Sequence, residues 1–291
     1  MKIDLHSHSN RSDGKETPTE VFEWAAKAGL EVLALTDHDT TSGWDEAEQV
    51  AKRLGMGFLP GIEVTTEAQI AGRSHRISVH MLAYLPNPED QKLIDGMGGT
   101  VETRVLRAQQ ITERLGKDFN ITWQHVLDQL RPGATIGRPA IADALVELGH
   151  AADRSDAFNF LLSERGPYFV PHTAPDTLEM IGTIRAAGGV PVIAHPLTGF
   201  TEEARRKNLP QEHFEQLIAA GLAGFEVFHR DVPELAREWL LDLAQHHDLI
   251  VTGSSDYHGV SGKPNRLGEN MTDPEMLERI LQQGSGTHPR F

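Results

Sequence analysis

The sequence contains no cysteine. Disulfide bridges, thiolate zinc sites, cysteine-ligated iron–sulfur clusters and a cysteine nucleophile are therefore excluded. No apolar run reaches the length of a membrane-spanning helix. The first residues include Asp4 and His6, where a signal peptide would have an apolar core. These absences predict a cytoplasmic protein that does not bind to a membrane.

Positive charge is also scarce. The 291 residues include 27 Lys and Arg against 42 Asp and Glu, so the formal net charge is −15. Binding to duplex nucleic acid needs clustered cations, so we expect no duplex partner. A small anionic substrate is compatible with this charge if metal ions supply positive charge locally. No feature of the sequence indicates a protein partner.

The order of the predicted elements is that of an α/β protein. Seven short runs rich in Val, Ile and Leu predict strands at residues 2–5, 32–36, 57–64, 76–84, 190–194, 224–228 and 249–253. Helical patterns alternate with them at 18–29, 42–54, 176–187, 211–220, 233–247 and 273–283, and Ser42 is expected to cap the second. The alternation favours a mostly parallel sheet, and seven strand–helix units suggest a barrel. Residues 284–291 are expected to form a loose tail.

A helical insertion interrupts this alternation after the fourth strand. Residues 95–168 show helical periodicity and no convincing strand, with helices expected at 103–115, 122–130, 139–148 and 155–162. We therefore divide the chain into a first barrel part (1–94), an insertion that caps the substrate site (95–170) and a second barrel part (171–291). A length of 291 residues suits one domain with an insertion.

Histidine is the informative residue type, with 15 in the chain. His6 and His8 lie two residues apart at the end of the first strand, so their side chains share a face and can bind one ion. Alone, such a pair is more often surface histidine, and the nearby Asp13 is more often a turn residue. His38 follows the second strand, where the neighbouring Asp39 suffices for helix capping. His38 therefore stays a candidate ligand.

The third and fourth strands each contain one polar side chain that an apolar strand would not need. Glu63 is a lone carboxylate, and burial of a carboxylate requires either a cation or metal ions as its partner. With histidines nearby, a bridge between metal ions is the better interpretation. His80 lies inside the next apolar strand, so we prefer it as a ligand over His75, which lies at the entry to that strand.

The remaining candidate ligands follow the fifth and seventh strands. The fifth strand ends in His195, and the seventh leads into Asp256 and His258, which again share a face. The complete set is His6, His8, Asp13, His38, Glu63, His80, His195, Asp256 and His258. Strand ends converge on one rim of a barrel, where active sites form. Nitrogen and oxygen ligands without sulfur suit two or three divalent ions such as Mn²⁺, Zn²⁺ or Fe²⁺.

Short motifs surround these ligands: Asp4-Leu5-His6-Ser7-His8, Thr36-Asp37-His38-Asp39, Gly61-Ile62-Glu63, the strand with His80, Ala194-His195-Pro196 and Ser255-Asp256-Tyr257-His258. In combination they resemble the PHP (polymerase and histidinol phosphatase) family over the whole chain. The insertion, with Ile136-Gly137-Arg138-Pro139, is similar to the small stand-alone TrpH/YciV-like branch. The resemblance implies a distorted (β/α)₇ TIM-like barrel with a helical insertion.

The resemblance also implies how the ligands are shared among up to three ions, with Mn²⁺ expected and Zn²⁺ or Fe²⁺ as alternatives. The first ion would be held by His6, His8, Glu63 and Asp256, the second by Glu63, His80 and His195, and the third by Asp13, His38 and His258. Two departures from the family pattern bear on substrate contacts rather than on the metal site. Ala140 follows the Gly-Arg-Pro where many relatives have histidine, and residues 164–168 replace a turn that is often rich in lysine.

Members of this branch are described as 3′,5′-nucleoside bisphosphate phosphatases and as 5′→3′ exoribonucleases on short RNA. The resemblance therefore implies a metal-dependent phosphoesterase that removes the 3′-phosphate from molecules such as adenosine 3′,5′-bisphosphate and gives 5′-mononucleotides. Short 5′-phosphorylated RNA is a further expected substrate. The residues expected to be catalytic are Glu63, His195, Asp256 and His258. Paired metal ions activate water and neutralise phosphoryl charge, so no serine nucleophile is required.

A second phosphate on the substrate would need a binding site away from the metals, and arginine suits this because its fork donates two hydrogen bonds to phosphate. Arg138, at a loop-to-helix junction, is the first choice. Arg104 and Arg107 share one helix face, and His172 and Ser7 are further candidates. A solvated helix face is the alternative interpretation of these arginines.

Two other features leave alternatives open. Phe160 and Tyr168 could stack on a base, although packing in the core suits Phe160 as well.

A histidinol-phosphate-type phosphatase is the nearest alternative function, but its amine substrate needs an acidic pocket and the insertion supplies arginines. A non-catalytic metal-binding partner of a polymerase is the other alternative, and the nearly full set of ligand positions favours an enzyme instead.

Overall fold

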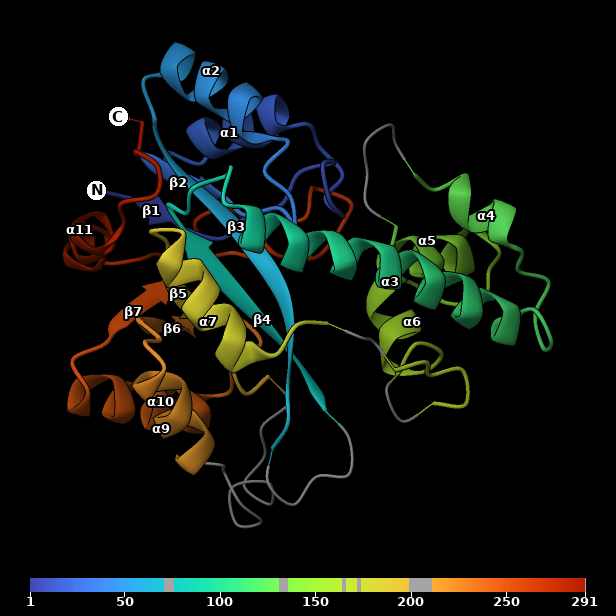
Figure 1. Ribbon diagram of the computed structural model, residues 1–291. Helices are drawn as coiled ribbons and strands as arrows, with labels where there is room; N and C mark the ends of the chain where they lie inside the picture. The colour runs from blue at the N-terminus through green and yellow to red at the C-terminus, as the bar shows by residue number, and fades with distance from the viewer. Residues whose placement is uncertain (71–75, 131–135, 164–165, 172–173, 199–210, 291) are drawn as a thin grey trace.

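Seven strands form one sheet that curves into a nearly closed barrel in the computed structural model (Figure 1). The structure describes residues 1–70, 76–130, 136–163, 166–171, 174–198 and 211–290. The strands follow one another in chain order: β1 (Ile3–Asp4), β2 (Val32–Leu35), β3 (Gly57–Ala68), β4 (Ile77–Tyr84), β5 (Val190–Ile193), β6 (Gly224–Phe228) and β7 (Ile250–Gly253). All seven predicted strands are confirmed, and so is the distorted barrel.

The sheet is mixed rather than wholly parallel. Strand β4 runs antiparallel to both β3 and β5, and the other neighbouring pairs are parallel. The first and last strands approach each other where Ser7 forms a parallel bridge with Tyr257, and the amide of His8 donates to the carbonyl of Tyr257 over 2.8 Å. The barrel is therefore drawn together at the end where most of the predicted ligands lie.

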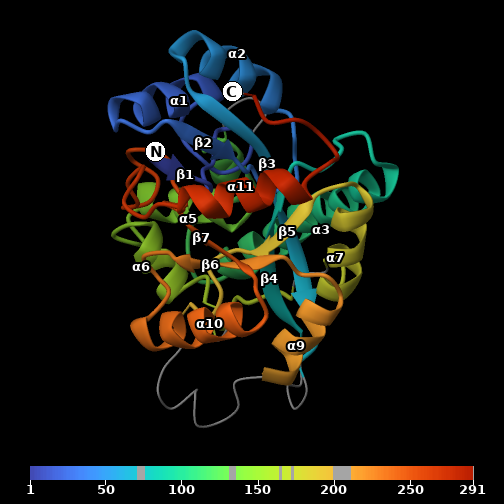
Figure 2. The same cartoon turned by 90° about the vertical axis from the view of Figure 1, so that its left-hand side faces the viewer.

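Helices surround the sheet, as Figures 1 and 2 show. Those of the barrel are α1 (Pro18–Lys27), α2 (Trp44–Leu54), α7 (Thr177–Ala186), α9 (Gln211–Ala219), α10 (Glu234–His246) and α11 (Pro274–Gln283). Those of the insertion are α3 (Gln91–Leu115), α4 (Trp123–Leu127), α5 (Arg138–Glu147) and α6 (Arg154–Asn159). In Figure 1, α11 and both chain ends lie on the opposite side of the sheet from the insertion. No helix in the described residues is long and apolar enough to cross a membrane.

Local sequence signals explain where α1 and α2 begin. Helix α1 starts with a capping box, in which the Thr17 hydroxyl accepts from the amide of Glu20 and the Glu20 carboxylate accepts from the amide of Thr17. The prediction that Ser42 caps α2 is wrong, because the cap position is Gly43 and no side chain caps it. The hydroxyl of Ser42 instead accepts a hydrogen bond from Thr40 over 3.1 Å.

The insertion has an apolar core of its own. Buried residues from Ala108 to Val170 form one cluster, whereas Leu93 and Met97 at the start of α3 belong to a cluster of the barrel. The long helix α3 therefore packs against the barrel with its first turns and against the insertion with its last turns. The division of the chain at residues 94 and 170 stays a prediction.

The expectation of a loose tail is wrong for residues 284–290. The amides of Ser285 and Gly286 donate to the carbonyl of Gly188 over 2.8 and 3.1 Å, and Phe58 and Arg290 exchange two backbone hydrogen bonds of 2.7 and 2.9 Å. A Cβ atom on Gly286 would lie 2.1 Å from the carbonyl oxygen of Ala187. The tail is held by backbone hydrogen bonds and by the close approach of the chain that Gly286 permits. Neither feature gives a hydrophobic pattern in the sequence, so the sequence did not predict the ordered tail.

Candidate metal centre and substrate cavity

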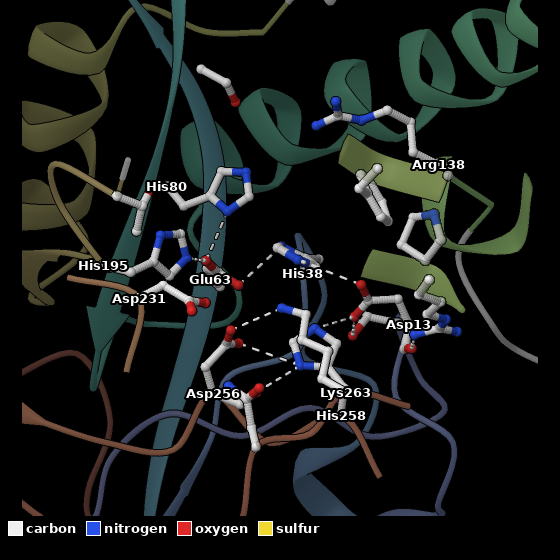
Figure 3. A pocket seen from close by; sticks show the side chains of 18 of the residues that line it. Asp13, His38, Glu63, His80, Arg138, His195, Asp231, Asp256, His258 and Lys263 are labelled. Carbon is white, nitrogen blue, oxygen red and sulfur yellow. Dashed lines mark hydrogen bonds and ion pairs between the residues drawn. The ribbon is translucent and has the colours of Figure 1, made fainter. Parts of the chain in front are cut away.

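The barrel brings the candidate ligands together at one end of the sheet (Figure 3). His6 and His8 follow β1, His38 follows β2, His195 follows β5, and Asp256 and His258 follow β7. Glu63 lies within β3 instead of at its end, and His80 lies opposite Thr65 on the antiparallel strand β4. The rule that ligands follow the ends of parallel strands therefore applies to β1, β2, β5 and β7 only.

Glu63 is the centre of this arrangement. Its side chain is buried, with an exposed fraction of 1%. Oxygen Oε2 lies 3.2, 3.1 and 3.3 Å from imidazole nitrogens of His6, His8 and His38. Oxygen Oε1 lies 2.9 and 3.0 Å from nitrogens of His80 and His195. One buried carboxylate thus faces five imidazoles, which is the position that a metal-bridging ligand requires.

The side chains fall into three overlapping groups that could each hold an ion. Their members are His6, His8, Glu63 and Asp256; His38, Glu63 and His80; and His8, Asp13, His38 and His258. The first group has the four members that the family resemblance implies. In the second, His38 accompanies Glu63 and His80, while Nε2 of His195 contacts the same carboxylate. In the third, His8 joins the three expected residues.

The donor atoms fit divalent ions. The Nδ1 atom of His38, the Oδ1 atom of Asp256 and the Nε2 atom of His258 are buried and have no hydrogen-bond partner within the described residues. Buried polar atoms normally have such a partner, and coordination of a metal ion would satisfy these three atoms. The Nε2 atoms of His6 and His8 face each other over 3.0 Å. Nitrogen and carboxylate donors without sulfur suit Mn²⁺, Fe²⁺ or Zn²⁺.

The electrostatics favour positive charge at the centre. Burial raises the pKa of Glu63 and of Asp13, but the surrounding histidines outweigh it and hold both values well below the usual range. Burial lowers the pKa of His258 to about 4, although the neighbouring carboxylate of Asp13 acts in the opposite direction. Burial also lowers the pKa of His8, but the carboxylates of Asp256 and Glu63, 3.3 and 3.1 Å from its Nε2, outweigh burial and raise the pKa to about 9. An ion that binds to His8 must therefore displace a proton.

A cavity of about 700 Å³ lies over the metal groups and extends to the insertion. The barrel side of its lining includes the carboxylates of Asp13, Glu63 and Asp256. The insertion side includes Arg104, Arg107, Arg138, Arg154 and Phe158. The lining therefore combines a carboxylate–imidazole wall with a wall rich in arginine.

The predicted arginines differ in their contacts. The guanidinium of Arg104 donates to Asp39 and, over 2.6 Å, to the hydroxyl of Thr65, so this side chain ties α3 to the rim of the barrel. The Nε–H of Arg107 donates to the carbonyl of Val170 over 2.7 Å. The guanidinium carbon of Arg138 lies 5.4 Å from the ring centre of Phe158, and Figure 3 shows Arg138 on the side of the cavity that faces the metal groups.

Among the described residues that were predicted to contact substrate, Ser7, Phe160 and Tyr168 do not line the cavity. The hydroxyl of the fully buried Ser7 donates to the carbonyl of Ala34 over 2.7 Å, which argues against a contact with substrate. Phe160 is 70% exposed, and the hydroxyl of Tyr168 donates to Asp118 over 2.8 Å. Among the described residues, Phe158 is the phenylalanine that lines the cavity. His172 and His75 lie outside the described residues.

Three polar side chains at the site were missed by sequence reasoning. Glu226 on β6 is fully buried and contacts His6, and His229 lies 3.5 Å from Oδ2 of Asp256. The ammonium of Lys263 lies 2.8 Å from the same oxygen of Asp256. Glu226 carries the same signal as Glu63, a lone carboxylate in an apolar strand. Lys263 lies in a polar loop, and nothing in the pattern distinguishes it.

The barrel and its histidine–carboxylate groups define a metal-dependent hydrolase. A family model described as the PHP domain matches residues 4–130. The chain is 33% identical over 290 residues to a 3′,5′-nucleoside bisphosphate phosphatase of Chromobacterium violaceum, covering 96% of this chain and 94% of the relative. It is 31% identical over 284 residues to a 5′-3′ exoribonuclease of Haemophilus influenzae, covering 93% and 94%. The chain belongs to the PHP domain family.

A solved structure extends the likeness to the whole fold. A candidate metal-dependent phosphoesterase of Bifidobacterium adolescentis superposes with a TM-score of 0.89 at 44% identity, covering 97% of this chain and 96% of the other. The predicted family is thus confirmed, and the protein is a metal-dependent phosphoesterase. The identity of its metal and the residues that bind it stay predictions.

Proposed function

We propose that this enzyme hydrolyses the 3′-phosphate of 3′,5′-bisphosphonucleotides, such as adenosine 3′,5′-bisphosphate, and releases 5′-mononucleotides. The observation that carries the proposal is the cavity itself, in which the metal groups on one wall face arginines of the insertion on the other. A substrate with two phosphates matches two separated anion sites. The names of the Chromobacterium violaceum relative, a 3′,5′-nucleoside bisphosphate phosphatase, and of the Haemophilus influenzae relative, a 5′-3′ exoribonuclease, support the same chemistry.

The charge of the lining supports a phosphorylated substrate. Six cations line the cavity in the part of the chain that the structure describes, namely Arg104, Arg107, Arg138, Arg154, Arg230 and Lys263, against the four carboxylates of Asp13, Glu63, Asp231 and Asp256. Three of those carboxylates belong to the metal groups, so Asp231 alone among the described lining residues would face a substrate amine. A zwitterionic amine such as histidinol phosphate is therefore a poorer match than a bisphosphate.

The nine ligands predicted from the sequence would hold two or three divalent ions, with Mn²⁺ the expected metal. Such ions activate water for attack on phosphorus and neutralise the phosphoryl oxygens. Glu63 would orient the ions through both of its oxygens, since each oxygen faces a different set of imidazoles. His195, Asp256 and His258 line the same wall and would surround the reacting phosphate.

The wall of the insertion would hold the rest of the nucleotide. Arg138 would bind the 5′-phosphate, because a guanidinium donates two parallel hydrogen bonds to a phosphate. Phe158, beside Arg138, would take the stacking role that the sequence suggested for Phe160 and Tyr168. Substrate bound in this way would span the cavity from the arginines of the insertion to the metal groups.

Short 5′-phosphorylated RNA presents the same two groups, a 5′-phosphate followed by a phosphoryl bond at the 3′ oxygen. One site can therefore accept a bisphosphonucleotide and the 5′ end of an RNA. The net charge of −15 disfavours long or duplex nucleic acid. We expect small nucleotides and short single strands as substrates, and location in the cytoplasm stays a prediction.

The direct test is phosphate release by the Mn²⁺-loaded protein from adenosine 3′,5′-bisphosphate, compared with 3′-AMP, 5′-AMP and histidinol phosphate. Preference for the bisphosphate, with 5′-AMP as the organic product, is the expected result. Equal rates on 3′-AMP and the bisphosphate would remove the role of the arginine wall. Activity confined to histidinol phosphate would overturn the proposal and leave only the metal-dependent hydrolase.

A further inference from the structure

Strand β6 is the one strand that delivers none of the nine candidate ligands, yet its central carboxylate lies directly behind them. Glu226 is fully buried. Its Oε1 atom lies 2.9 Å from Nδ1 of His6 and accepts a hydrogen bond from the hydroxyl of Ser254. Its Oε2 atom accepts from the backbone amide of His195 over 2.7 Å. One carboxylate thus contacts the chain after β1, β5 and β7.

These contacts make Glu226 unsuited to be a ligand itself. A carboxylate offers acceptor sites only, and here the two oxygens are occupied by an imidazole, a hydroxyl and a backbone amide. The group lies on the far side of the His6 ring from Glu63, because His6 presents Nδ1 to Glu226 and Nε2 to Glu63. The ring of His6 therefore separates Glu226 from the centre of the metal groups.

We infer that Glu226 is a positioning residue that makes His6 and His195 competent to bind metal. A neutral imidazole carries one N–H and one lone pair, and the hydrogen bond that one nitrogen makes decides which nitrogen can bind an ion. With the Nδ1–H of His6 donated to Glu226, the lone pair lies on Nε2. That atom faces the group of His8, Glu63 and Asp256.

The same carboxylate also holds the backbone of His195. This residue has a backbone φ of 30°, in the left-handed region that residues other than glycine rarely adopt. Such a conformation persists only where surrounding contacts compensate for its cost. The amide of His195 donates to Glu226 over 2.7 Å, and its Nε2 lies 3.0 Å from Oε1 of Glu63. Glu226 therefore stabilises a strained turn that directs one imidazole at the bridging carboxylate.

The substitution that tests this is Glu226→Gln, which keeps the shape of the side chain and removes one acceptor oxygen. If the new NH₂ group faces His6, it donates to Nδ1 and forces the ring proton onto Nε2. If it faces His195 instead, two donors meet and the strained turn loses its acceptor. Either orientation removes one of the two contacts, so metal binding is impaired in both.

Asp4→Asn is the matched control. Asp4 is also fully buried beside His6, but no imidazole among the described residues donates to it; it accepts from the backbone amides of Ser255 and Gly268 over 3.0 and 2.9 Å and from that of His6 over 3.4 Å. Loss of the Asp4 carboxylate affects folding without changing the tautomer of any imidazole. Comparison of the two variants therefore separates a general loss of stability from a specific loss of metal binding.

The measurement is calorimetric titration of each protein, first stripped with EDTA, with Mn²⁺ and with Zn²⁺. We expect Glu226→Gln to weaken the affinity about 10- to 100-fold, and Asp4→Asn to leave it unchanged relative to wild type once both variants are shown by circular dichroism to be folded. Wild-type affinity in Glu226→Gln would overturn the inference. Failure of the wild type itself to bind metal would overturn the proposed function instead.

A measurement that needs no Glu226 variant keeps the inference testable if Glu226→Gln does not fold. Nitrogen-15 NMR of the Zn²⁺-loaded protein reports which ring nitrogen of His6 carries the proton, with the signals assigned from a His6→Gln variant. A proton on Nδ1 supports the inference. A proton on Nε2, or a deprotonated Nδ1, contradicts it.

Discussion

Arg154 and Asp143 form a double hydrogen bond, from Nε to Oδ1 and from one terminal nitrogen to Oδ2, each over 2.6 Å. Lys15, in the loop that carries Asp13, contacts the same carboxylate from the barrel. Arg154 also approaches the carbonyl of Asp13 over 3.5 Å. The insertion is thus tied to the loop of a candidate metal ligand through Asp143.

We expect Asp143→Asn to lower the free energy of unfolding at pH 7 by about 2 kcal/mol, the range for hydrogen bonds to charged groups. Burial raises the pKa of Asp143, but Arg154 and Lys15 outweigh it and lower the value. A lowered pKa contributes stability that is complete above the unfolded-state value of about 4 and is lost as the pH falls through the folded-state value.

Urea unfolding of wild type and Asp143→Asn between pH 7 and pH 3 checks this. The difference in the free energy of unfolding between the two proteins should stay constant down to about pH 5 and shrink below about pH 4. A difference that is the same at every pH would show that the ionised carboxylate contributes nothing beyond its shape.

Arg138→Ala should raise KM for adenosine 3′,5′-bisphosphate about 10- to 100-fold, the loss expected for a charge-assisted contact of about 1.5–3 kcal/mol. KM for a simple phosphate ester should change little, because such a substrate has no second phosphate. Arg53→Ala is the control, since Arg53 is exposed on α2 and pairs with Glu23 outside the cavity. Equal effects of Arg138→Ala on both substrates would remove the phosphate-binding role.

Phe158→Leu should raise KM for the bisphosphonucleotide about 5- to 100-fold, in line with about 1–3 kcal/mol for stacking of one base. KM for ribose 3,5-bisphosphate, which has no base, should not change. Phe160→Leu serves as the control because Phe160 is 70% exposed and does not line the cavity. If Phe158→Leu affects both substrates alike, Phe158 supports the insertion core and does not bind the base.

Removal of metal should lower the thermal stability. Ligand that binds only the folded state adds about 2.7 kcal/mol at a concentration of 100 times Kd, so Tm should rise by several degrees when Mn²⁺ is returned to EDTA-stripped protein. Glu63→Gln should abolish most of this rise, since Glu63 contacts five imidazoles. Calorimetric melts that show the same rise in both proteins would contradict the central place of Glu63.

The strands and the candidate ligands could be predicted because each leaves a local pattern. Apolar runs marked the strands, and His6, His38 and His195 stood out as polar residues directly after them. Glu63 was recognisable because a carboxylate in an apolar strand needs a partner. The antiparallel direction of β4 was not predicted, although no helix was expected between the third and fourth strands and a parallel pair needs a longer, usually helical, crossover.

The contacts of the substrate wall could not be predicted for a different reason. Side chains of the insertion reach the cavity according to how α3, α5 and α6 pack, and a shift of two residues, about half a helical turn, separates Phe158 from Phe160. The ion pair of Arg104 with Asp39 joins residues 65 positions apart. Periodicity shows which face of a helix is apolar, but it does not show which distant segment meets that face.

The most direct test of the account is a crystal structure of the Mn²⁺-loaded protein with 5′-AMP and inorganic phosphate, the two expected products. We predict metal ions at the groups around Glu63, inorganic phosphate on those ions, and the 5′-phosphate of the nucleotide on Arg138. A 5′-phosphate on the metal ions, with the arginine wall empty, would contradict the account.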